Sequence, residues 1–66
     1  MTKLSQNEKT VIKEYAGCNM NIAETARNLH HSRELINETM SMIEMQTGMD
    51  PKKFYDLTEL VKEADR

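Results

Sequence analysis

The sequence predicts an all-α domain of four helices, and three observations support this prediction. In four stretches, apolar residues recur every three or four positions, the spacing that gathers them on one face of a helix. A serine, asparagine or aspartate lies near the start of each stretch, as is typical of residues that cap a helix N-terminus. We find no strand pattern, repeat or low-complexity segment. With 66 residues, the chain is expected to form a single domain over residues 1–66.

The first predicted helix runs from Leu4 to Ala16. Ser5 and Glu8 have the spacing of a capping box, in which each side chain accepts a hydrogen bond from the other residue's backbone N–H. The helix carries a narrow apolar stripe of Leu4, Val11, Ile12 and Tyr15. Gly17 is suited to end it, and residues 17–20 are predicted to form a loop.

The next two predicted helices lie between residue 21 and about residue 47. Asn21 with Glu24 marks the start of the first, His30 and His31 form a tight break, and Ser32 is the predicted cap of the second. The apolar residues fall at helical spacing on both sides of the break: Ile22, Ala23, Ala26 and Leu29 before it, and Leu35, Ile36, Met40 and Ile43 after it. Because Ala26 is small, the two helices can cross closely, which predicts a helix-turn-helix.

Gly48 is predicted to end the second of these helices, and the fourth helix follows. Asp50 is expected to cap the fourth helix and Pro51 to occupy its first position, although Asp56 and Glu59 also allow a later start. Its predicted buried face consists of Phe54, Leu57, Leu60, Val61 and Ala64.

Residues of this central stretch resemble the C-terminal domain of PucR-type transcriptional regulators, the group that includes the sugar-diacid regulators. The resemblance covers about residues 4–64 without a gap and rests on Ala26, Leu29, Arg33, Ile36, Met40, Ile43, Thr47, Gly48, Met49, Asp50 and Pro51. It implies a helix-turn-helix that binds DNA with a recognition helix beginning near Ser32. The family's other polar contact positions are replaced here by Ser32, Glu34, Leu35, Glu38 and Thr39, so Arg33 is the one carried over.

The predicted function is therefore that of a small DNA-binding transcriptional regulator. The residues expected to approach duplex DNA are Thr25, Arg27, Ser32, Arg33, Asn37 and Ser41. Arginine suits a phosphate or a guanine edge, and asparagine suits an adenine edge. The alternative for Arg33, Asn37 and Ser41 is ordinary polar surface.

A second function, from a different class, uses the same scaffold to bind a protein as an inhibitor or adaptor of a larger regulator. Two carboxylates on the predicted recognition helix, Glu34 and Glu38, oppose DNA binding because they repel phosphate. The net charge of −2 points in the same direction. A surface for a homodimer or another partner is predicted at Met42, Met45, Met49, Leu57, Leu60 and Val61; alternatively, the last helix covers the methionines.

Other function classes are not expected. We find no convincing arrangement of catalytic residues and predict no enzyme activity and no cofactor. Cys18, His30 and His31 lack the paired spacing of a zinc site, so no metal is predicted. A single cysteine and the lack of a membrane-spanning run favour a cytoplasmic protein without a membrane partner.

Overall fold

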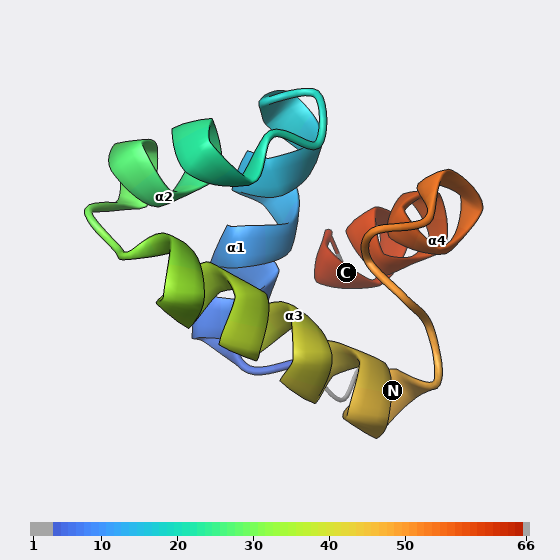
Figure 1. Cartoon of the computed structure of the whole chain (residues 1–66). Helices are drawn as coiled ribbons and strands as arrows, with labels where there is room; N and C mark the ends of the chain where they lie inside the picture. Colours follow the sequence, from blue (N-terminus) through green and yellow to red (C-terminus); the bar gives the residue numbers. More distant parts are fainter. Residues whose placement is uncertain (1–3, 66) are drawn as a thin grey trace.

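A computed structural model describes residues 4–65 and has the expected all-α architecture of four helices. The helices are α1 (Gln6–Gly17), α2 (Ile22–Leu29), α3 (Arg33–Thr47) and α4 (Phe54–Ala64). Helix α1 lies between α2 and α4, and α3 crosses below α1 and α2 (Figure 1). None of the helices within residues 4–65 is long and apolar enough to cross a membrane.

The predicted caps begin the first three helices. Ser5 and Glu8 form a complete capping box, with the Glu8 carboxylate accepting the Ser5 backbone N–H at 2.9 Å. Asn21 accepts the backbone N–H of Glu24 at 3.0 Å, and Ser32 accepts that of Leu35 at 3.1 Å. These bonds satisfy N–H groups that a helix leaves free in its first turn, so the three helix starts follow from local chemistry.

The break between α2 and α3 is a tight turn at His30. This residue has a left-handed backbone, with φ 59° and ψ 38°, in the position that glycine often takes after a helix. The backbone N–H of His31 donates to the Ala26 carbonyl at 2.8 Å. Because the turn is so short, α3 starts at once in a new direction and packs across α2, as in a helix-turn-helix.

The start of α4 lies between the two starts that the sequence allowed, one at Asp50 and a later one at Asp56 or Glu59. Asp50 and Pro51 do not begin the helix, which instead starts at Phe54 with Lys53 as its cap residue. The Asp50 carboxylate accepts the backbone N–H of Lys52 at 2.9 Å, and the Asp50 carbonyl accepts that of Lys53 at 3.0 Å. Asp50 therefore closes a separate turn with its own side chain, as aspartate commonly does, and the helix follows this turn.

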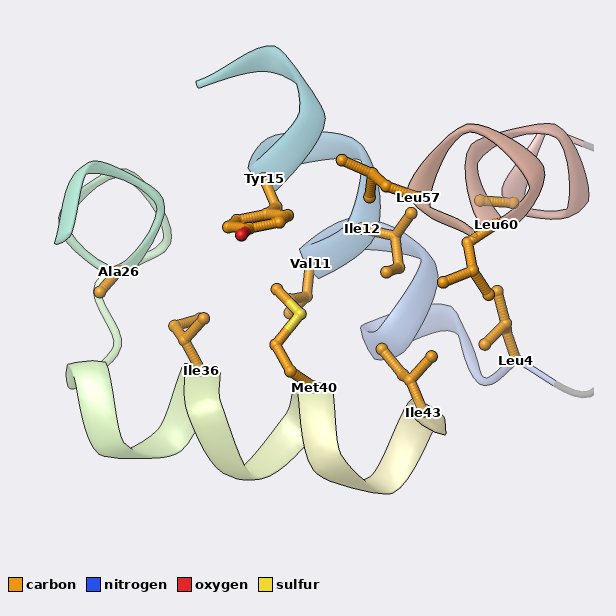
Figure 2. Close-up of a cluster of buried hydrophobic side chains, with 11 residues drawn as sticks. Leu4, Val11, Ile12, Tyr15, Ala26, Ile36, Met40, Ile43, Leu57 and Leu60 are labelled. Carbon is orange, nitrogen blue, oxygen red and sulfur yellow. The ribbon is translucent and has the colours of Figure 1, made fainter. Parts of the chain in front are cut away.

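The core gathers apolar side chains from all four helices around α1. Figure 2 shows residues of α1 pointing towards Ile36, Met40 and Ile43 of α3 and towards Leu57 and Leu60 of α4. The buried apolar set is Leu4, Val11, Ile12, Tyr15, Ala26, Ile36, Met40, Ile43, Leu57, Leu60 and Ala64. Packing against this shared core fixes the direction in which each helix presents its exposed face.

Candidate functional site

Helix α3 has one buried face and a long exposed face. Ile36, Met40 and Ile43 are buried at intervals of three and four residues, together with Thr39, so the other residues between them point outwards. The Ser32 cap and the His30 turn set the N-terminal end of this helix against α2. The exposed face of α3 is therefore held in a defined direction by the core and by the turn.

Four of the predicted DNA-facing residues form one polar strip at the N-cap and along one side of α3. Arg33, Asn37 and Ser41 are all exposed and are spaced four residues apart, which aligns them along one side of the helix. Ser32 is also exposed at the end of this strip, where its oxygen accepts the Leu35 N–H at 3.1 Å. Its hydroxyl hydrogen stays available to donate. We call Ser32, Arg33, Asn37 and Ser41 the polar strip.

A second strip of different chemistry runs along the adjoining side of α3. It consists of the carboxylates Glu34 and Glu38 and the apolar side chains Leu35, Met42 and Met45. Met45 is 85% exposed and Met42 is 50% exposed. Within residues 4–65 neither carboxylate forms an ion pair. We call these five residues the acidic strip; it brings negative charge and apolar surface close to the polar strip.

Of the two residues of helix α2 that were predicted to contact DNA, Arg27 and Thr25, only Arg27 is exposed. Arg27 is exposed in the last turn of α2, near the turn that leads to Arg33. Thr25 is fully buried, and its hydroxyl donates to the Asn21 carbonyl at 2.8 Å. The expectation that the Thr25 side chain approaches DNA is therefore wrong, because position 25 falls on the inner face of the short helix.

Four of the cations, Arg27, Arg33, Lys52 and Lys53, lie towards the two ends of α3. Arg27 and Arg33 lie at its N-terminal end, whereas Lys52 and Lys53 follow its C-terminal end. A helix of 15 residues is about 22 Å long, so the two pairs of cations are far apart. Of these four cations, Arg27 and Arg33 are therefore the two near the polar strip.

The six residues predicted to form a partner or dimer surface do not share one surface. Leu57 and Leu60 belong to the core, because α4 packs along α1 and turns these side chains inwards. Val61 and Met49 are partly buried beside that core. Met42 and Met45 stand exposed on α3, which also excludes the alternative that α4 covers these two methionines. The prediction that these six residues form one partner or dimer surface is therefore wrong.

Potential ligands and reactive groups are dispersed. Among residues 4–65, no group of three histidine, cysteine, aspartate or glutamate side chains could hold a metal ion. The Cys18 thiol donates to the Glu14 carboxylate at 3.5 Å and accepts from the Asn28 amide at 3.4 Å. Desolvation and this bond to Glu14 raise the pKa of Cys18, which keeps the thiol in its less reactive protonated form.

One surface feature was missed by the sequence-based predictions. An apolar groove of about 410 Å³ separates the end of α1 and the following loop from α4; its walls are Ala16, Asn19, Met20, Phe54, Leu57, Thr58, Val61 and Lys62. Asn19 and Met20 line it from two consecutive left-handed backbone positions, with φ of 55° and 63°. Phe54 was predicted to be buried but is 66% exposed at the rim. The adjacent aromatic pair Phe54-Tyr55 is the sequence feature that could have indicated it.

Comparisons with protein-family models, with curated proteins and with solved structures found no match to this chain.

Proposed function

We propose that this chain is a small DNA-binding regulator that inserts α3 into the major groove. The observation that carries the proposal is the polar strip, which lies on the exposed side of the helix that follows a tight turn. In helix-turn-helix proteins, the N-terminal residues of this second helix contact base edges. The resemblance to PucR-type regulators supports the same assignment, and Arg33 is the contact position common to both.

The polar strip has the chemistry to contact both backbone and bases. The guanidinium of Arg33 can bond a phosphate or both acceptors of a guanine edge, and the Asn37 amide matches the adenine edge. Ser41 and Ser32 can donate to phosphate oxygens, and the exposed Arg27 on α2 would neutralise the flanking DNA backbone. Phosphate contacts would set the register of the protein, and Arg33 and Asn37 would read the sequence.

The acidic strip limits non-specific affinity in this proposal. Glu34 and Glu38 repel phosphate unless one of them accepts from a cytosine amino group. Together with the net charge of −2, this predicts weak binding to random DNA and greater dependence on the correct base sequence.

Fluorescence anisotropy with random and genomic duplexes at low salt tests the proposal. The affinity should fall as salt is raised, with a slope that reflects the number of neutralised phosphates. Arg33→Ala should weaken specific binding by about 1–3 kcal/mol, and Glu38→Gln should strengthen non-specific binding. Lys13→Ala is the matched control, because Lys13 is an exposed cation that pairs with Asp65 at the end of α4.

Two results would reject the DNA proposal. One is the absence of binding to every duplex at low salt. The other is an Arg33→Ala variant that binds like the Lys13→Ala control, which would move the contact surface away from α3.

The acidic strip favours a second candidate, a protein adaptor or inhibitor. Leu35 and Met42 are exposed beside the carboxylates of the acidic strip. This surface suits the binding of a partner's amphipathic helix that has an apolar face and basic flanks. NMR titration with a leucine- and lysine-rich helical peptide is the test. Shifts confined to the acidic strip, together with no binding to any duplex, would favour the adaptor; the absence of peptide shifts would reject it.

A further inference from the structure

We infer that the outer face of α4 pairs with the same face of a second copy, with the two helices antiparallel and Thr58 near the two-fold axis. The inference concerns self-association and stands independently of DNA binding. It starts from two aromatic side chains at the beginning of α4: Phe54 is 66% exposed and Tyr55 is 83% exposed. Their rings pack edge to face with the ring centroids 5.7 Å apart, so the two side chains form one apolar projection next to the groove.

The projection and the groove are complementary parts of one surface. Phe54, Thr58 and Val61 follow each other at intervals of four and three residues along α4, and all three line the groove. In a two-fold contact, if residue i meets residue j, then j also meets i. Antiparallel pairing about Thr58 sets Phe54 of each copy opposite Lys62 of the other, and Tyr55 opposite Val61. Each aromatic pair would thus cover the groove of the other copy.

Charges at the two ends of α4 favour the antiparallel direction. Lys52 and Lys53 directly precede the helix, and Asp65 directly follows it. Antiparallel pairing brings the lysines of one copy beside Asp65 of the other, whereas parallel pairing would bring like charges together. Asp65 pairs with Lys13 at 3.0 Å within the chain, but its side chain is 63% exposed and remains open to a second cation.

The size of the surface makes the expected dimer weak. Helix α4 has 11 residues and is about 16 Å long. A standard interface buries about 800 Å² on each partner, a large share of the 4395 Å² that this chain exposes. One short helix and its groove provide less than this, so association in the micromolar to millimolar range is expected. The polar strip stays free, because it lies on α3 rather than α4.

Sedimentation equilibrium of the full chain, followed up to about 1 mM, is the test. The wild type should self-associate, and Thr58→Glu should weaken association at least about tenfold, because it places two carboxylates together at the axis. Met45→Glu is the matched control: it adds the same charge at an exposed site on α3 and should leave association unchanged. Circular dichroism checks that each variant remains folded.

A charge exchange tests the direction of pairing. Lys53→Glu should weaken association, and adding Asp65→Lys to it should restore association if the helices are antiparallel. Both positions are exposed, so both variants should fold. A wild type that stays monomeric to about 1 mM would overturn the inference. Dissociation by Met45→Glu without an effect of Thr58→Glu would also overturn it, because that result would place the contact on α3. A charge exchange that fails to restore association would overturn it as well.

Discussion

Replacing His30 with glycine should stabilise the helix-turn-helix. His30 is exposed and has a left-handed backbone, with φ 59°. This conformation costs a residue with a Cβ atom about 1–2 kcal/mol, whereas glycine adopts it freely but loses about 0.5–1 kcal/mol more conformational entropy on folding. The turn's hydrogen bonds use backbone atoms and are retained. The expected net gain in free energy of unfolding is about 0.5–1 kcal/mol.

Urea and thermal unfolding followed by circular dichroism measure this gain. For a domain of this size it corresponds to a rise in melting temperature of several degrees, at about 4–8 °C per kcal/mol. Ala23→Gly is the matched control, because Ala23 is exposed in the first turn of α2 with a right-handed backbone, so glycine relieves no strain there and should cost up to about 1 kcal/mol. If His30→Gly destabilises the protein as much as Ala23→Gly does, the left-handed turn is refuted.

Two further predictions concern the core. Leu60→Glu should unfold the chain, because Leu60 is fully buried, whereas Tyr55→Glu should leave the monomer folded. Circular dichroism distinguishes the two outcomes. A folded Leu60→Glu variant would contradict the placement of α4. Burial, with a smaller contribution from the Asp50 charge, raises the pKa of Tyr15. A tyrosine in the unfolded chain ionises at about pH 10, whereas Tyr15 in the folded chain keeps its proton to a higher pH. The stability that this group contributes below about pH 10 is therefore lost as the pH rises above that value, because the unfolded state ionises first. Urea midpoints should therefore fall less between about pH 9 and pH 11 in Tyr15→Phe than in the wild type; equal falls would refute the assignment.

Features set by short-range chemistry were predictable from the sequence. Ser5, Asn21 and Ser32 cap their helices as expected, because each needs only a backbone N–H two or three residues away. Gly48 ends α3 with a left-handed backbone, as predicted. The buried positions of α3 also follow from their spacing, with two exceptions: Leu35 lies exposed at the edge of the buried face, and Thr39 is buried.

Features that depend on how helices pack were not predictable in this way. Periodicity showed that α4 is amphipathic but not which helix it would cover, so Leu60 was assigned to a partner surface although it packs towards α1. Phe54 has the right spacing for the core, but the Asp50 turn makes it the first residue of α4, at the rim of the groove. Thr25 was assigned to DNA by its polarity, although its hydroxyl is satisfied within the helix.

The polar strip was predictable as a set of candidates, but the position of the other cations relative to it required a structure. Arg33, Asn37 and Ser41 share one side of α3 because they are four residues apart. The fold adds that Arg27 lies near their N-terminal end and that Lys52 and Lys53 do not. Side-chain chemistry alone could not distinguish these two groups of cations.

Mapping a duplex onto the backbone amides of α2 and α3 by NMR tests the central proposal most directly. The proposal predicts that titration with a bound duplex shifts the amide signals of Arg27, Arg33, Asn37 and Ser41, and that higher salt reverses the shifts. The signals of Tyr55 and Thr58 should change little. Shifts centred on Met42 and Met45 with an unchanged polar strip, or no shifts at low salt with any duplex, would contradict the assignment of α3 as the helix that reads DNA.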